Sequence, residues 1–153
     1  MIKVVNRKWR KGLLIGIGLL LMTGIAIFIY YQTLTHQDTT KIKAEYTVEA
    51  IPFIKEFEKD YKAANKKYAE KIISVSGIIT KVEQTADTIV NIKISDTTGN
   101  SYLIFAFQDQ HIAGAKMARS GDRIQIKGSC SDAIYSDILE GYSISFKRSA
   151  IDK

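Results

Sequence analysis

The sequence contains few of the residues that usually carry catalysis or bind metals. Of 153 residues, one is cysteine and two are histidine. His36, His111 and Cys130 are widely separated along the chain, and such a set does not form a metal-ligand cluster. Gly114 and Gly128 also lack the helix-opening context that a phosphate-binding loop needs. We therefore expect neither a metal nor a cofactor.

A short acidic segment is the remaining candidate for catalysis. Asp132, Asp137 and Glu140 lie close together in the sequence, and two of them could form a carboxylate pair for acid–base chemistry. Acidic residues are also routine on solvated loops, and this is the interpretation we favour. The sequence thus predicts no catalytic residues and a protein that is not an enzyme.

The N-terminal part holds one long uncharged run, from Gly12 to Tyr31. A helix rises about 1.5 Å per residue, so this run matches a hydrocarbon core about 30 Å thick. The preceding residues include no acid and five bases: Lys3, Arg7, Lys8, Arg10 and Lys11. By the positive-inside rule, the N-terminus is cytoplasmic and the rest of the chain is extracytoplasmic. The sequence predicts a single-pass protein of the cell (inner) membrane.

A cleaved signal peptide is the alternative interpretation of this run. Its apolar region is usually about 7 to 15 residues long and ends at a small-x-small site, which "YYQTLTHQ" does not provide. We therefore favour an uncleaved signal anchor. Gly12 and Gly16 form a G-x-x-x-G motif that offers one route to a homodimer, although glycines are common in membrane helices and Gly18 and Gly24 are present too.

The net charge of +6 depends mainly on this N-terminal segment. Without the five leading bases, 17 basic and 16 acidic residues remain, a balance of +1. The positive net charge therefore comes from the residues that precede the predicted anchor, and it gives little support to a nucleic-acid-binding surface on the domain. The predicted organisation is a basic cytoplasmic segment, a transmembrane anchor, a polar tether and one domain, at residues 1–11, 12–31, 32–45 and 46–153.

The domain begins with an amphipathic helical pattern. Apolar residues recur at spacings of three and four at Phe53, Phe57, Tyr61, Ala64 and Tyr68. Pro52 fits the first turn, where a missing N–H costs no hydrogen bond. The aromatic stripe could be a ligand platform, but its spacing is that of a face packed on a core.

Alternation of apolar and polar residues then predicts five strands, at residues 72–83, 88–95, 101–107, 123–130 and about 142–151. Gly77 suggests a bulge or bend in the first strand. The second and third strands should form a hairpin through "DTTGN", with Gly99 able to take positive φ. Residues 108–119 could hold a helical turn.

This pattern predicts a mainly β fold, a five-stranded OB-fold-like Greek-key barrel preceded by an amphipathic helix and a single N-terminal transmembrane helix. Other five-stranded barrels give similar patterns. Two stretches, "DYKAANKKYAEKIISVSGIITKV" and "GDRIQIKGSCSDAIYSDILEGYSI", resemble the tRNA-anti-like family of bacterial OB-fold proteins, which includes lipoproteins. The residues that carry the resemblance are Tyr68, Lys71, Val75, Gly77, Gly121, Asp122, Ile124, Ile126, Lys127, Gly128 and Cys130.

The resemblance covers about residues 46–151 and implies the fold, with no catalytic residues to carry over. Family members often have a lipid-modified N-terminal cysteine, where this chain has the apolar run. Family members often have further cysteines near the positions of Phe105 and Tyr142. Because this chain has aromatic residues there, it cannot form an internal disulfide.

Cys130 is in phase with Ile124 and Ile126, which predicts an inward, core position rather than a reactive thiol. An intermolecular disulfide through this lone cysteine is the other option, and would be a second route to a homodimer.

The predicted function is a membrane-anchored, extracytoplasmic binding or interaction module of the cell envelope, for a protein, peptide or glycan. The outward residues of the second and third strands, Asn91, Lys93, Tyr102 and Ile104, include only one cation and one aromatic ring. A single-stranded nucleic-acid binder is the alternative, which would gain if the phase of the third strand were reversed so that Phe105 and Phe107 faced outward. The predicted ligand-binding residues are Lys93, Tyr102, Arg123 and Lys127.

Overall fold

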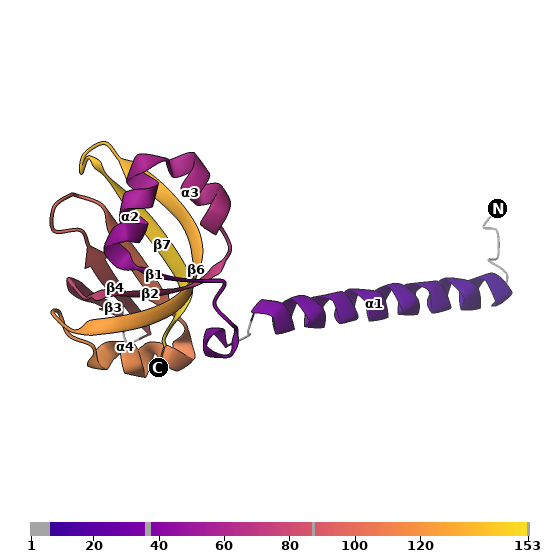
Figure 1. Ribbon diagram of the computed structural model, residues 1–153. Helices are drawn as coiled ribbons and strands as arrows, with labels where there is room; N and C mark the ends of the chain where they lie inside the picture. Colours follow the sequence, from indigo (N-terminus) through magenta and orange to yellow (C-terminus); the bar gives the residue numbers. More distant parts are fainter. Residues whose placement is uncertain (1–6, 36–37, 87, 153) are drawn as a thin grey trace. The chain divides into compact units, whose positions relative to one another are not determined.

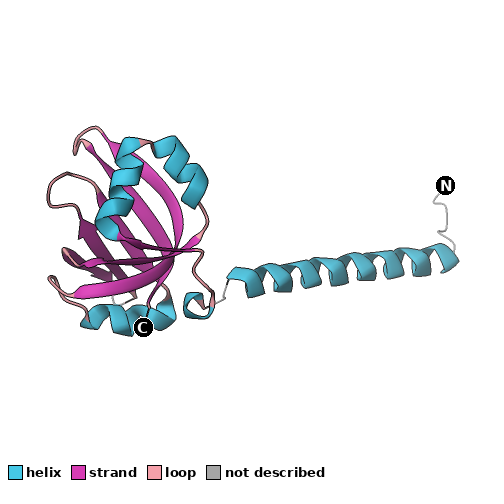
Figure 2. Cartoon of the chain, viewed as in Figure 1, coloured by secondary structure: helices cyan, strands magenta, loops and turns pink. Residues whose placement is uncertain are grey.

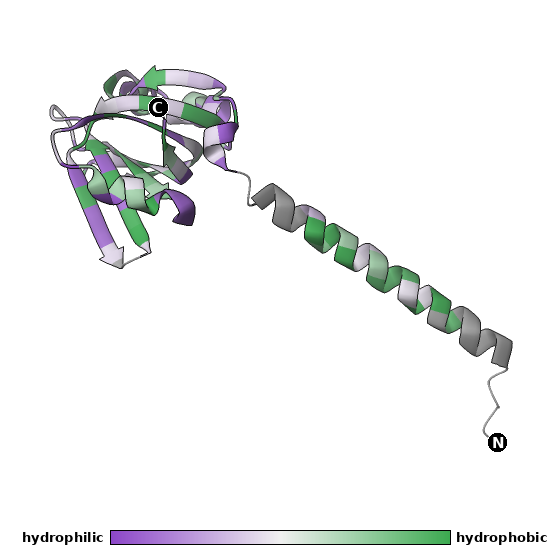
Figure 3. Cartoon of the chain, turned by 90° about the horizontal axis from the view of Figure 1, so that it is seen from below, coloured by the Kyte–Doolittle hydropathy of each residue, from purple (hydrophilic) through white to green (hydrophobic). Residues whose placement is uncertain are grey.

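The structure is a computed structural model that describes residues 7–35, 38–86 and 88–152, without the side chains of residues 7–12, 14, 31–35 and 86. The chain divides into two units, residues 1–37 and 38–153. The first unit contains the helix α1, Arg7–Thr35, so the predicted helix over residues 12–31 is confirmed, and Figure 3 shows many hydrophobic residues along it. Among the residues searched, which are those the structure describes, no helix is long and apolar enough to cross a membrane.

The second unit is a curved seven-stranded mixed sheet with helices at its ends (Figure 2). Its strands are β1 (Tyr46–Glu49), β2 (Ile72–Ile78), β3 (Lys81–Ala86), β4 (Ile89–Ser95), β5 (Tyr102–Phe107), β6 (Arg123–Ser136) and β7 (Gly141–Ile151). They lie in the order β1-β2-β6-β7-β5-β4-β3. The pairs β1–β2 and β5–β7 are parallel, and the other pairs are antiparallel.

The predicted count of five strands is wrong for two reasons. The predicted first strand is divided into β2 and β3 at Ile79 and Thr80, and β1 is an added edge strand. The amide of Ile79 donates to the Asp122 carbonyl at 2.9 Å, while the next amide, Thr80, donates to the Lys93 carbonyl at 2.9 Å. One segment therefore hydrogen-bonds near both ends of the strand order, which closes the sheet into the partly open barrel expected of this fold.

Gly77 is required for close packing rather than for a bulge. A Cβ built on it would lie 2.9 Å from the Ala50 Cβ and 3.1 Å from Ile94 side-chain atoms. The strand ends after it, at Ile78. Among the described glycines, only Gly121 has positive φ, at 94°, so the expectation for Gly99 is also wrong.

The predicted amphipathic helix is two helices, α2 (Ala50–Lys59) and α3 (Tyr61–Tyr68). They are separated by Asp60, whose extended backbone ends α2 and whose carboxylate accepts from the Ala63 amide at 3.0 Å. Both lie at one end of the barrel, and α4 (Ile112–Met117) lies at the other end (Figure 1). With the 3-10 turn η2 (Asp109–His111), α4 confirms the predicted helical turn.

The aromatic stripe packs into the core, as its spacing predicted. Phe53, Phe57 and Tyr68 are each at most 1% exposed, and the Phe53 and Tyr68 ring centroids are 4.8 Å apart. This burial rules out the stripe as an open ligand platform. The antiparallel β4–β5 hairpin is confirmed, and Phe105 is 0% exposed, so the alternative phase of β5 with Phe105 outward is wrong.

Residues 32–45, predicted as a polar tether, include the end of α1 and a second 3-10 turn, η1 (Thr39–Lys41). His36 lies outside the described residues. The strand β6 continues six residues beyond the predicted end at Cys130, so most of the predicted loop before the last strand is part of a β6–β7 hairpin. The physical reason is that the polar and apolar residues of this segment still pair regularly, from Asp132 with Ser145 to Ser136 with Gly141.

Candidate binding surfaces

The outer face of β4 and β5 brings two of the predicted site residues together. Val90, Ile92 and Ile94 fill the core, so strand alternation points Lys93 outward. Lys93 pairs with Ile104 and Ser95 pairs with Tyr102 across the hairpin, which makes Lys93 and Tyr102 diagonal neighbours. The Lys93 Nζ lies 5.0 Å from the centroid of the Tyr102 ring, within the range of a cation–π contact.

Glu83 on β3 sits between two lysines of the same face. Lys81 and Lys93 lie directly opposite each other on β3 and β4, where like charges repel. The Glu83 carboxylate binds both ammonium groups, at 2.9 Å from Lys81 and 3.1 Å from Lys93. The hydrogen bonds from Lys81 and then Lys93 lower the pKa of Glu83, so it is ionised at neutral pH. Two ammonium groups share one carboxylate, so the charge of this cluster is partly compensated and neither lysine is a free cation.

Arg123, at the start of β6, is not part of this cluster. Its guanidinium donates to both carboxylate oxygens of Glu49, at 3.0 and 3.3 Å. Both side chains are exposed, at 69% and 56%, so the pair is screened by solvent and contributes little to stability.

Lys127 is buried, so its predicted surface position is wrong. It is 9% exposed, and its Nζ binds Asp152 at 3.1 Å and donates to the Thr40 carbonyl at 3.4 Å. Ser74 donates to the same carboxylate at 2.7 Å. Lys127 lies opposite Ser74 of β2, on the face of β6 away from the core residue Ile126, and it is buried because Thr40 of η1 and Asp152 cover this part of the outer face. Lys127 thus joins η1 to the barrel; the binding roles of all four predicted residues stay predictions.

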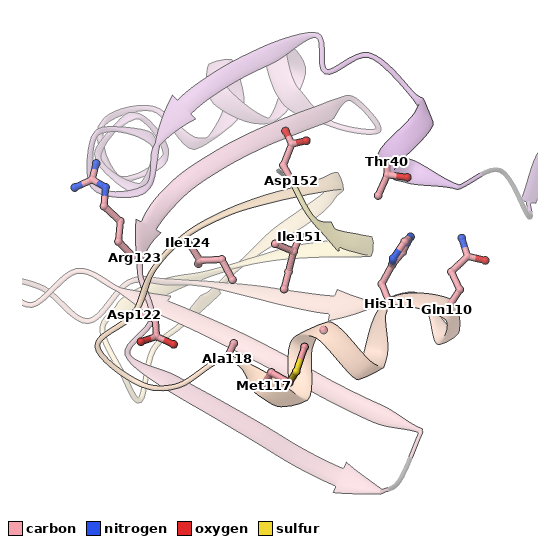
Figure 4. Close-up of a pocket in the computed structure, with 11 residues that line it drawn as sticks. Thr40, Gln110, His111, Met117, Ala118, Asp122, Arg123, Ile124, Ile151 and Asp152 are labelled. Carbon is pink, nitrogen blue, oxygen red and sulfur yellow. The ribbon is translucent and has the colours of Figure 1, made fainter.

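A cavity of about 900 Å³ lies at the end of the barrel that carries α4 (Figure 4). It is lined by apolar groups of Met117, Ala118, Ile124 and Ile151 and by polar groups that include His111 and Asp152. His111 and Arg123 lie at opposite ends of the cavity, and His111 faces Thr40 of η1 (Figure 4). The sequence did not predict this site, because its residues come from four separated segments without a shared motif.

A contact between His111 and Asp38 lies at one end of the cavity. The His111 Nε2 lies 2.8 Å from the Asp38 carboxylate, which also accepts from the Thr40 amide at 3.0 Å and from its hydroxyl at 2.8 Å. These bonds, first of all the one with His111, hold the pKa of Asp38 well below its usual range. The amide of Thr39 donates to the Gln108 side chain at 3.2 Å. These contacts attach the start of the second unit to the barrel.

Cys130 is a core residue, as its strand phase predicted. It is a free thiol with 0% exposure. Burial raises the pKa of the thiol to about 12, with smaller contributions from Glu70 and Asp132. A neutral, inaccessible thiol is neither a nucleophile nor a partner for another chain. The expectation of a homodimer through Cys130 therefore fails for the folded domain.

The acidic residues of the β6–β7 hairpin have different surroundings. Asp132 accepts hydrogen bonds from the Tyr61 hydroxyl at 3.2 Å and from the Ala133 amide at 2.8 Å. Asp137 and Glu140 lie in the exposed turn. In the described part of the chain, no group of three or more His, Cys, Asp and Glu side chains is placed to hold a metal ion.

Comparisons with known proteins agree with this barrel. The model of the tRNA_anti-like family matches residues 6–139. No curated protein matches the chain. A crystal structure from Klebsiella pneumoniae, described as a "putative nucleic acid-binding lipoprotein", is 16% identical with a TM-score of 0.53 and covers 69% of this chain and 91% of its own. At this identity the likeness shows the fold alone.

Two further solved structures are more distant. The OBody AM3L09, solved bound to hen egg-white lysozyme, is 16% identical with a TM-score of 0.43, over 56% of this chain and 84% of its own. A "putative aspartyl-tRNA synthetase" from Leishmania major is 7% identical with a TM-score of 0.45, over 75% of this chain and 22% of its own. With TM-scores below 0.5, these two add nothing to the fold assignment.

Proposed function

Because the chain belongs to the tRNA_anti-like family, we propose that it is a non-catalytic binding module that presents the outer face of β4 and β5 to a protein, peptide or glycan. The observation that carries this proposal is the cluster of Lys93, Tyr102 and Glu83. It combines an aromatic ring, an ammonium and a carboxylate on the three neighbouring strands β5, β4 and β3. Within a few ångströms, such a cluster can stack on a flat group and can donate and accept hydrogen bonds. These contacts suit a partner with mixed polar and apolar groups.

Charge compensation argues for such a partner over a polyanion. Binding to nucleic acid depends on cations that are free to replace the counterions of phosphates. On this face Lys81 and Lys93 share one carboxylate, which a phosphate would have to displace. The balance of +1 beyond residue 31 points the same way.

We further propose that residues 12–31 of α1 anchor the module in the cell membrane, with the barrel on the extracytoplasmic side. The support is the uncharged run and the five preceding bases. Fusing reporters after Lys153, one active only outside the cytoplasm and one active only inside, tests this topology. Activity of the inside reporter alone would contradict it.

Single-stranded nucleic acid is the second candidate ligand. The description of the Klebsiella protein as nucleic acid-binding favours it, as does the Tyr102 ring, on which a base could stack. Under this alternative the Glu83 ion pairs would break on binding.

Photo-crosslinking in cells separates the two candidates. A photoreactive amino acid replaces Tyr102, and in a matched control it replaces Lys59, which is exposed on α2 and not on the β4–β5 hairpin. Both adduct fractions are analysed for protein, glycan and nucleic acid. Protein or glycan adducts specific to position 102 support the proposal. Nucleic acid adducts specific to that position support the alternative, and adducts equal at both positions would rule out this face.

A further inference from the structure

We propose that the tip of the β6–β7 hairpin binds an apolar, basic segment of a partner protein. The proposal rests on the function proposed above, and it assigns the partner's chemistry and a second contact site. The site is the hairpin patch, defined as Ile134, Tyr135, Ile138 and Leu139.

The hairpin patch is unusually exposed for its composition. Ile134 is 64%, Tyr135 50%, Ile138 94% and Leu139 48% exposed. Single exposed apolar residues are normal on a protein surface, but here four large ones lie within six positions of one hairpin. Patches of this kind mark interaction sites.

The base of the hairpin is held rigidly, so the patch is ordered before any partner arrives. The Tyr142 ring stacks on Tyr61 of α3 with centroids 5.7 Å apart, and it meets the Tyr135 ring edge-on at 5.1 Å. The Tyr142 amide donates to the Ser101 hydroxyl at 3.0 Å. A preformed site avoids the entropy cost of ordering a loop on binding. The hairpin lies at the end of the barrel that carries α2 and α3 (Figure 1).

The charge of the hairpin itself selects the partner. Between Lys127 and Lys147 the chain has no basic residue, and it has three acids, Asp132, Asp137 and Glu140. The last two flank the most exposed side chains of the turn. Negative charge repels the phosphates of nucleic acids and of anionic lipids. It complements Lys or Arg, so a segment with apolar and basic residues fits both features.

The patch is continuous with the face of the proposed function. Tyr102 of β5 pairs with Ser143 of β7, and Ser143 pairs with Ile134 of β6. These three side chains therefore lie in one row across adjacent strands. A partner seated on Tyr102 can extend along this row to the hairpin patch.

Fluorescence anisotropy with a defined probe tests the site. The probe is a labelled peptide of alternating Lys and Leu, and its counterpart replaces Lys by Glu. The full chain is held in phosphatidylcholine nanodiscs, with empty nanodiscs as the blank. We expect the Lys peptide to bind at least tenfold more tightly than the Glu peptide. The double variant Ile138→Ser, Leu139→Ser should lower its affinity at least tenfold, and Asp137→Asn with Glu140→Gln severalfold.

Met117→Ser is the matched control, because Met117 is an apolar residue 77% exposed on α4, at the other end of the barrel. It should leave the affinity unchanged. Thermal unfolding of each variant checks that the fold is kept. Equal binding of both peptides, or Lys-peptide binding that the hairpin variants do not change, would overturn the proposal. Self-association or binding to anionic vesicles that depends on the patch would also overturn it, since the occupant would then be a second copy or a lipid surface.

The two proposals can fail separately. Protein adducts at position 102 without any patch-dependent peptide binding would overturn the hairpin site and keep the proposed function. Nucleic acid adducts at position 102 would overturn the proposed function, and with it the partner class assigned to the hairpin.

Discussion

Lys93 is held between two partners on the neighbouring strands: its Nζ lies 5.0 Å from the centroid of the Tyr102 ring on one side and 3.1 Å from the Glu83 carboxylate on the other. The side chain is 24% exposed, so it is partly shielded from water without being buried. Its position is fixed by two contacts, and its charge is compensated by one of them. The ligand preference of this face therefore depends on Glu83.

Removing the Glu83 charge should make the face attractive to polyanions. Glu83→Gln leaves Lys81 and Lys93 free to contact phosphates. We expect tighter binding of single-stranded oligonucleotides, with a log K against log salt slope steeper by about 0.7 for each added contact. Anisotropy titrations at several salt concentrations measure this slope, and Glu45→Gln, which breaks the exposed pair with Lys71, is the control. An unchanged slope would mean that these lysines do not reach the ligand.

Asp96 should make the stability of the domain sensitive to acid. Its carboxylate binds Lys55 at 2.6 Å and accepts from the Thr98 amide at 2.9 Å, and these bonds lower its pKa to about 2 from 3.8. A lowered pKa stabilises the fold above about pH 4, and this stabilisation is lost as the pH falls toward 2.

The variant Asp96→Asn tests this contribution. Its free energy of unfolding should be below that of the parent at pH 7, and the difference should shrink between pH 4 and pH 2. Urea unfolding at fixed pH values measures both. Lys55→Met, which removes the largest cause of the shift, should lose part of the same pH dependence. A difference that is constant across this range would contradict the assignment.

Gly141 should not tolerate a side chain. A Cβ at this position would lie 2.6 Å from the Asn100 carbonyl carbon and 2.7 Å from its oxygen, and backbone atoms cannot easily move away. We expect Gly141→Ala to lower the free energy of unfolding by about 1–3 kcal/mol, as overpacking does. Gly99→Ala is the control, since its nearest neighbouring atom would be 3.5 Å away. Equal losses in the two variants would count against the close approach.

Cys130 should resist thiol reagents until the domain unfolds. The side chain is 0% exposed, and its pKa is raised to about 12 by burial. Mass spectrometry after brief labelling, with and without urea, measures its reactivity. Cys130→Ser should cost about 1–3 kcal/mol if the new hydroxyl finds no partner. Rapid labelling of the folded chain would contradict the core position.

Local patterns of the sequence were sufficient for several elements. The alternation of Val90, Ile92 and Ile94 predicted β4 and its buried face, and the spacing of Phe53, Phe57 and Tyr68 predicted a helix face packed on the core. The phase of Cys130 predicted its burial. These features follow from periodicity, because backbone geometry alone decides which side chains share a face.

Features that depend on contacts between distant segments were decided by the tertiary structure. Asp38 and His111 are 73 positions apart in the sequence and meet only in the fold. The cavity is likewise lined by residues from separate segments. Lys127 alternates with apolar residues, which predicts an outward position, yet Thr40 of η1 and Asp152 cover that position and bury it. The division of the first predicted strand follows from hydrogen bonds near both ends of the sheet. Sequence periodicity thus determined which residues face the core, whereas closure of the barrel determined which polar side chains meet, because those contacts arise only when separate strands come together.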